Sequence, residues 1–113
     1  MRYLLAHDIG TSGDKATLFA EDGTLIGSIL GEYPTHYDRG GVGEQHPADW
    51  WRAVCETTRE MAKLVDKKSI AAVSFGGQQM GCACIDREGR PLRSSIIWAD
   101  TRSGKEAQYI ADH

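Results

Sequence analysis

The stretch HDIGTSGDKATLF, residues 7–19, joins two short apolar runs through a turn rich in glycine and hydroxyl groups. Residues 2–7 form the run before the turn, and residues 14–20 form the run after it. Both runs are typical of short strands. Glycine-rich turns after a strand often hold phosphate, but most of them open a helix. Because a second strand follows here, the stretch predicts two strands joined by a polar turn.

Two well-known nucleotide loops do not fit this turn. The Walker A loop needs Gly-x-x-x-x-Gly-Lys-Ser/Thr before a helix, whereas Gly10 and Gly13 lie too close together and Lys15 comes one residue late. The dinucleotide fingerprint Gly-x-Gly-x-x-Gly is also absent. The turn therefore belongs to neither class of nucleotide-binding protein.

The turn nevertheless carries groups that can hold phosphate. Its glycines would let the backbone approach a ligand, and its N–H groups could form an anion-binding concavity. Hydroxyls and a cation complete the candidate set, which is Gly10, Thr11, Ser12, Gly13 and Lys15. Asp8 repels phosphate unless a hard cation such as Mg²⁺ lies between them, directly or through water. An ordinary hairpin whose turn is capped by Asp8 fits the same residues equally well.

The rest of the chain predicts a mixed sheet and one long helix. Residues 24–33 are expected to form a third strand after a tight turn at Asp22-Gly23, and residues 34–46 are expected to form a loop. A helix should begin near Pro47. Its buried face is predicted from the spacing of Trp51, Val54, Cys55, Thr58, Met61, Ala62 and Val65. Trp50 and Trp51 are both assigned to helix packing.

The C-terminal half predicts further strands and a final helix. Residues 69–77 should form a central strand, and a hairpin should follow with its turn at Glu88-Gly89. A helix is expected after Asp100, and no Gly or Pro stops it before His113. The chain is therefore expected to be the front piece of a longer protein. The order of elements predicts an α/β fold with a mixed sheet and antiparallel opening strands.

Composition limits the class of function. The chain has 113 residues and a net charge of −3, which gives no indication of a nucleic-acid or membrane partner. Its three cysteines lack the spacing of a disulfide framework, which favours a reducing cytoplasm. Cys82 and Cys84 alternate along an expected strand, so both thiols should face one side, where they are expected to be buried.

Three segments together resemble one protein family. Asp-x-Gly-Thr-Ser between two strands resembles the first phosphate loop of the actin and sugar-kinase superfamily, whose domains have a ribonuclease-H-like core. GEQHPADWW, residues 43–51, and IIWADTR, residues 96–102, resemble segments of the FGGY carbohydrate kinases. The segments occur in the family's order and at about its spacing. The chain is therefore similar to the xylulokinase-like members of that family.

The resemblance implies a kinase made of two large domains with a cleft between them. Residues 1–113 would be the N-terminal portion of the first domain, and the rest of that domain and the whole second domain would be absent. ATP and Mg²⁺ would be the cofactors, with Asp8 orienting the metal or its water. The family's catalytic aspartate would lie beyond residue 113, so the isolated chain is expected to be inactive. The resemblance leaves a homodimer of the longer protein open.

The resemblance also assigns a sugar or polyol substrate. Gln79 and Met80 stand where xylulokinases show Met-His and glycerol kinases show Arg-Glu, which argues against xylulose and glycerol themselves. Trp98 matches a tryptophan that lies against the substrate, with core packing as the alternative. Asp100 could contact substrate, or it could have a structural role as an ion pair with Arg102 or as the start of the next helix.

Two other functions remain open from the sequence. One is an ATPase of the same superfamily, such as the activators of radical enzymes, which couple ATP to a conformational change. Residues 43–51 and 96–102 argue against it. The other is a non-catalytic binding module that keeps the fold, which the presence of Asp8, Thr11 and Lys15 makes less attractive.

Overall fold

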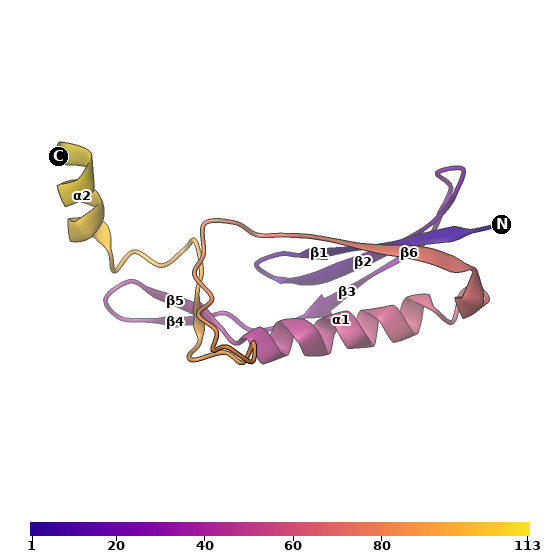
Figure 1. Cartoon of the computed structure of the whole chain (residues 1–113), viewed down its shortest axis with the longest axis horizontal. Helices are drawn as coiled ribbons and strands as arrows, with labels where there is room; N and C mark the ends of the chain where they lie inside the picture. The colour runs from indigo at the N-terminus through magenta and orange to yellow at the C-terminus, as the bar shows by residue number, and fades with distance from the viewer. The chain divides into compact units, whose positions relative to one another are not determined.

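The computed structural model describes residues 1–113, and the chain divides into two compact units (Figure 1). The first unit contains residues 1–34 and 48–78, and the second contains residues 35–47 and 79–113. Neither contains a helix that is long and apolar enough to cross a membrane.

A four-stranded mixed sheet forms the first unit. Its strands are β1 (Tyr3–Ile9), β2 (Gly13–Ala20), β3 (Leu25–Glu32) and β6 (Ile70–Gly77), arranged in the order β3-β2-β1-β6. The three opening strands are antiparallel, and β6 runs parallel to β1. Gly23 has a φ of 90°, so the turn predicted at Asp22-Gly23 is confirmed together with its need for glycine.

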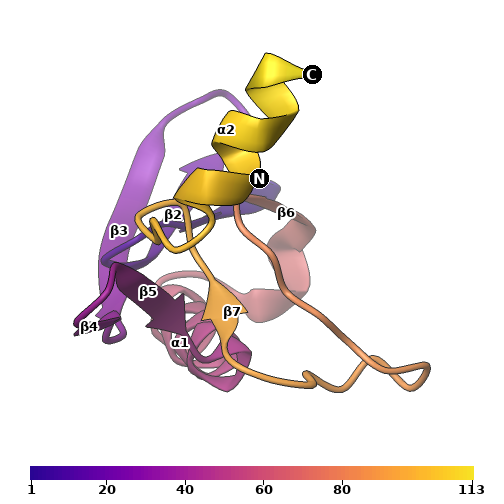
Figure 2. The same cartoon turned by 90° about the vertical axis from the view of Figure 1, so that its left-hand side faces the viewer.

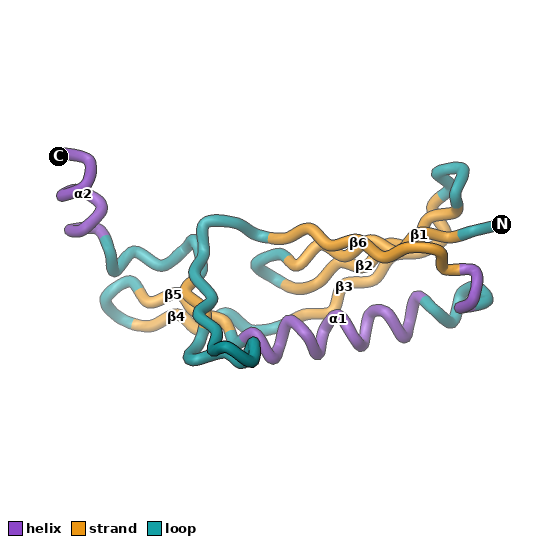
Figure 3. Tube along the Cα trace, in the orientation of Figure 1, coloured by secondary structure: helices purple, strands orange, loops and turns teal.

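The helix α1 (Pro47–Met61) supplies the crossover that a parallel strand requires, and a short 3₁₀ turn, η1 (Lys67–Ser69), leads from it into β6 (Figures 1 and 3). The core of the unit combines one face of the sheet with the end of the helix. Its buried members are Leu5, Ala16, Leu18 and Met61. The predicted helix is thus confirmed where the apolar spacing indicated it.

The buried face predicted from the apolar spacing is confirmed except at Trp51. Val54 and Met61 are buried, and Cys55, Thr58, Ala62 and Val65 are half-buried. Ala53 and Thr57 are buried as well, while Trp51 is 67% exposed. The reason lies in β3, because a side chain placed at Gly31 would meet Ala53 and Thr57. The helix turns its small residues toward this close contact, where an indole would not fit.

The expected central position of β6 is also wrong for this chain. The strand is present over residues 70–77 but lies at the edge of the sheet, beside β1 alone. Most of its side chains are accordingly exposed, including Val73 and Phe75.

The second unit has a small sheet that the sequence did not reveal. β4 (His36–Asp38) and β5 (Val42–Gln45) occupy the segment expected to be a loop, and β7 (Ser95–Ile96) pairs with β5 (Figure 2). The hairpin expected after β6 is reduced to two isolated bridges, Cys82 to Ile96 and Ile85 to Pro91. Its turn is confirmed by Gly89, whose φ is 79°. The final helix, α2 (Gly104–Asp112), begins a few residues later than predicted.

Candidate functional site

The turn at residues 10–12 connects β1 to β2, as the sequence predicts. Asp8 and Lys15 are direct partners in the antiparallel ladder on either side of this turn. Opposite residues in such a ladder project to the same face, with Cβ atoms about 5 Å apart. Both side chains are exposed. The structure therefore places a carboxylate and an ammonium group side by side at the end of the sheet where the turn lies.

Gly10 and Gly13 differ in whether packing requires a glycine at that position. Neither has a positive φ, so the turn itself does not require glycine. A Cβ atom at Gly13 would overlap the carbonyl oxygen of Gly31 in β3, which means that packing explains this glycine. At Gly10 the nearest atom to an added Cβ is the carbonyl oxygen of Gly13 at 3.6 Å, an ordinary contact. Packing therefore does not explain Gly10.

Tyr33 holds the backbone of the turn through two hydrogen bonds. Its hydroxyl donates to the carbonyl oxygen of Gly10, and its N–H donates to that of Ser12 at 3.4 Å. Burial, together with the nearby carboxylates of Asp14 and Asp8, raises the pKa of Tyr33 to about 12. The phenol therefore remains a protonated donor at any physiological pH, and the backbone of the turn keeps its support.

The end of β6 is attached to the same turn. Gln78 N–H donates to the carbonyl oxygen of Ile9 at 2.9 Å, and Thr11 Oγ1 donates to Gln78 Oε1 at 3.4 Å. The first glutamine of GGQQMG thus meets the candidate phosphate turn. A cavity of about 220 Å³ lies here, lined by Ile9, Trp50, Gly76, Gly77 and Gln78. Ligands commonly bind beyond the carboxyl ends of strands in sheets of this kind.

Trp50 lines this cavity, a role that its assignment to helix packing did not include. The pattern of apolar spacing placed Trp51 on the buried face and gave no separate role to Trp50. One signal was available in the sequence, since Trp50 lies in the first turn of the helix that follows Pro47. The indole and the amide of Gln78 combine an apolar surface with a polar group, as small-molecule sites do.

A buried polar network beneath the turn was missed by sequence reasoning. His7 Nδ1 lies 2.7 Å from Asp14 Oδ2, Thr57 Oγ1 donates to the same oxygen at 2.7 Å, and His7 Nε2 lies 3.1 Å from Thr58 Oγ1. The side chains of His7 and Asp14 are fully buried. The other carboxylate oxygen of Asp14 has no partner. The network ties both strands that flank the turn to α1.

The signal for this network was the alternation of the strands. His7 follows Leu5 by two residues, and Asp14 precedes Ala16 by two residues, so both polar residues share the core face of the sheet. Asp8 and Lys15 consequently point to the opposite face.

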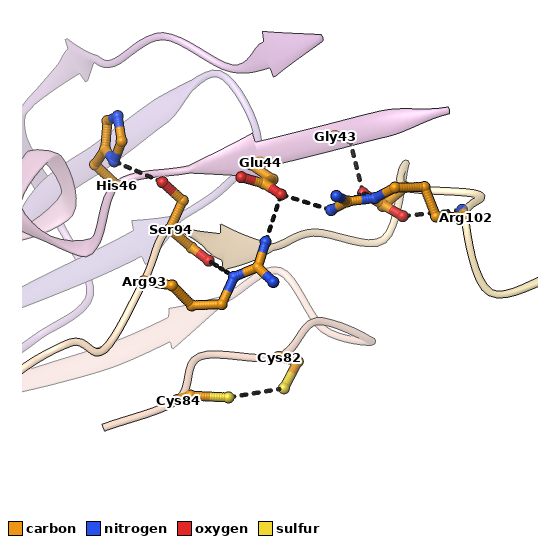
Figure 4. A network of polar contacts seen from close by, with 9 residues as sticks. Gly43, Glu44, His46, Cys82, Cys84, Arg93, Ser94 and Arg102 are labelled. Atoms are coloured by element: carbon orange, nitrogen blue, oxygen red, sulfur yellow. Dashed lines mark hydrogen bonds and ion pairs between the residues drawn. The ribbon is translucent and has the colours of Figure 1, made fainter. Parts of the chain in front are cut away.

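The remaining predicted site residues lie in the second unit, where Asp100 is held by a network (Figure 4). Gly43 N–H donates to Asp100 Oδ2 at 2.9 Å, and Arg102 Nη2 lies 2.7 Å from that oxygen and 2.5 Å from Glu44 Oε2. Arg93 Nη2 reaches Glu44 Oε2 at 2.7 Å. The hydrogen bonds from Arg102 and Gly43 hold the pKa of Asp100 well below its usual range. Of the predicted roles of Asp100, the ion pair is confirmed.

The other predicted substrate residues of the second unit, and its two cysteines, are exposed. Met80 is 87% exposed and has a φ of 58°, a conformation that side chains rarely adopt and that often occurs at functional sites. Trp98 is 53% exposed. The expected burial of Cys82 and Cys84 is wrong, because both thiols are exposed, although they do face one side. Gln79 is exposed beside Met80.

Comparison with known proteins places this geometry among carbohydrate kinases. The sequence profile of the N-terminal domain of the FGGY family of carbohydrate kinases matches residues 3–113. A xylulose kinase of Staphylococcus xylosus is 33% identical over 110 residues, which are 97% of this chain and 23% of that protein. A gluconokinase of Bacillus subtilis is 36% identical over 110 residues, which are 97% of this chain and 21% of that protein.

A solved structure supports the same fold. The ligand-bound xylulose kinase of Lactobacillus acidophilus superposes with a TM-score of 0.91 and 27% identity, over 99% of this chain and 23% of that chain. The predicted α/β fold with a mixed sheet is therefore confirmed. The chain spans between a fifth and a quarter of the length of the relatives that it matches.

Proposed function

The chain belongs to the FGGY family of carbohydrate kinases, and from this premise we propose that it forms the phosphate-binding part of a sugar kinase. That kinase transfers the γ-phosphate of ATP to a hydroxyl group of a ketose or polyol. The observation that carries the proposal is the pairing of Asp8 with Lys15 beside the turn at residues 10–12. Phosphoryl transfer asks a protein mainly to position groups and neutralise charge, and these are the groups it needs.

Each residue of the turn has a proposed role. Lys15 and the hydroxyls of Thr11 and Ser12 bind phosphate oxygens. Because Gly10 has no side chain, the phosphate can approach the backbone of the turn. Asp8 fits a Mg²⁺ site, because its exposed carboxylate is a hard oxygen ligand and this metal is usually held by one or two carboxylates plus phosphate and water. When bound, the metal would neutralise charge on the phosphates. Gly13 takes a packing role in the proposal.

The sugar is proposed to lie against the end of β6. Gln78 and Trp50 line the cavity there, and an indole face packs well on the C–H groups of a polyol while an amide can pair with hydroxyls. A volume of about 220 Å³ suits a small polyol better than a nucleotide. In the second unit, the proposed substrate-contacting residues are Gln79, Met80 and Trp98.

The isolated chain is proposed to bind but not to transfer phosphate. Asp8 is assigned to the metal and not to proton transfer. The catalytic aspartate of the family, which would take the hydroxyl proton, is expected outside residues 1–113. Sugar-dependent release of ADP by the purified chain, lost in Asp8→Ala, would overturn this part of the proposal.

The binding step can be tested directly on the chain. We expect Mg-ATP to shift the backbone amide signals of residues 10–13 in NMR spectra, and Asp8→Asn to weaken that shift. Glu106→Gln, which removes an exposed carboxylate from α2, is the matched control and should behave as the wild type. Equal shifts in the wild type and in Asp8→Asn would show that Asp8 is only a turn residue.

A further inference from the structure

Cys82 and Cys84 form a pair of thiols outside the phosphate turn. Their sulfur atoms lie 3.6 Å apart, and both side chains are exposed (Figure 4). The backbone on either side is fixed, because Cys82 exchanges two hydrogen bonds with Ile96, at 2.8 and 3.0 Å, and Leu92 N–H donates to Cys84 O at 2.9 Å. The thiols are thus held face to face by the structure around them.

A metal does not explain this pair. The structure contains no group of three or more His, Cys, Asp or Glu side chains that could hold an ion. Structural zinc requires four such ligands. Two accessible thiols without a third ligand are instead suited to exchange with a disulfide.

We propose that Cys82 and Cys84 are a redox site that closes into an intramolecular disulfide by exchange with a small-molecule disulfide. One cysteine, as the thiolate, attacks a sulfur of the small disulfide, forms a mixed disulfide and releases one thiolate. The second cysteine, as the thiolate, then attacks the Sγ atom of the first cysteine in this mixed disulfide, which forms the Sγ–Sγ bond, breaks the bond to the small molecule's sulfur and releases that sulfur as the other thiolate. The protein loses two electrons, the small molecule gains them, and the two thiol protons pass to the released thiolates.

The groups around Cys82 affect how the rate of thiol–disulfide exchange depends on pH. The hydrogen bond with Cys84 raises the pKa of the Cys82 thiol, while the guanidinium group of Arg93 acts in the opposite direction. Because the thiolate is the nucleophile, exchange becomes faster as the pH rises.

Closure must bring the two sulfur atoms from 3.6 Å to the roughly 2 Å of a disulfide bond. Because two hydrogen bonds with Ile96 fix the backbone of Cys82, we expect this movement to strain them. Exposed and strained disulfides are the readily reduced ones, so the reaction should be reversible. Because Ile96 lies two residues before Trp98, oxidation changes the support of a candidate sugar-binding residue.

The test uses the reduced chain in buffers of reduced and oxidised glutathione, with intact-mass and peptide analysis. We expect the wild type and Cys55→Ser to lose two hydrogen atoms through a bond between Cys82 and Cys84. Cys82→Ser and Cys84→Ser should instead carry one glutathione on the remaining thiol. Cys55 serves as the control because it is half-buried and has no second thiol beside it. A wild type that stays reduced, or that carries glutathione at Cys82 or Cys84 without closing, would overturn the proposal.

The backbone consequence has its own readout. Hydrogen exchange of the Ile96 amide, which donates to Cys82 O, should be about tenfold faster in the oxidised chain. The Ala20 amide, which donates to Thr24 O in the first unit, should be unchanged. A disulfide that forms without faster exchange at Ile96 would overturn the proposed link to Trp98.

Discussion

Asp8 of β1 lies directly opposite Lys15 of β2, with both side chains on the face of the sheet that α1 does not cover. One turn of three residues separates their strands. The pairing fixes an acid and a base at the place where the backbone turn is exposed to a ligand.

Asp8→Asn should strongly reduce phosphoryl transfer in a kinase that contains this chain, while sugar binding survives. Loss of one preorganised electrostatic group costs about 3–4 kcal/mol in the transition state. Steady-state kinetics at saturating Mg-ATP, with sugar affinity measured separately, would check this. Turnover close to the wild-type value would contradict the metal-orienting role.

The two glycines of the turn should separate packing from binding. Gly13→Ala should destabilise the chain by about 1–3 kcal/mol, because the added methyl group overlaps Gly31. Gly10→Ala should leave the free energy of unfolding within about 0.5 kcal/mol of the wild type but weaken the response to Mg-ATP. Urea denaturation and amide NMR shifts measure the two effects. A Gly10→Ala chain that responds normally would remove Gly10 from the site.

Asp14→Ala should destabilise the chain by about 3–5 kcal/mol, because His7 and Thr57 lose the acceptor that they share in the core. Replacing both members of the pair, as His7→Leu/Asp14→Leu, should cost less than the single change, since no buried polar group is left without its partner. Urea midpoints of the two variants decide the point. The opposite order of stability would mean that the pair is favourable in itself.

Tyr33 should make the stability of the chain depend on alkaline pH. The folded state raises the pKa of Tyr33 from 10.0 to about 12. The unfolded chain therefore loses the phenol proton first, and folding stability is full below pH 10 and falls as the pH rises through 12. Denaturation midpoints measured across this range should decline less in Tyr33→Phe. An equal decline in both proteins would assign the effect to other groups.

Met80→His should shift the substrate preference of a kinase that contains this chain toward D-xylulose. An apolar side chain such as that of Met80 contributes about 1–3 kcal/mol to discrimination between two substrates. A group that must form a hydrogen bond with a substrate hydroxyl contributes more. The measurement is the specificity constant for pentuloses, hexuloses, polyols and glycerol, before and after the change. If the wild type already prefers D-xylulose by more than about tenfold, or if no ratio changes, Met80 does not set specificity.

Local pattern was enough to predict much of the first unit. The strands at 2–7, 14–20, 24–33 and 69–77 each lie within a few residues of β1, β2, β3 and β6, because short apolar runs between turn residues have few alternatives. The glycines at 23 and 89 were predictable for the same reason, since their turns require a positive φ. The order of residues also placed Asp8, Thr11 and Lys15 around one turn.

Only the tertiary structure decided which residues of each helix and strand face the core, a cavity or the solvent. Spacing within α1 predicted most of its buried face but not the close contact of Ala53 and Thr57 with Gly31 in β3, more than twenty residues away. For the same reason it could not reveal that Trp50 lines a cavity and Trp51 is exposed. The same holds for the pairing of His7 with Asp14, which needs the register of two strands before their side chains can meet in the core. The short strands β4, β5 and β7 were invisible for a related reason. A strand of two to four residues is too short to show an alternating pattern in the sequence. It is stabilised by hydrogen bonds to a partner strand, which its own residues do not reveal.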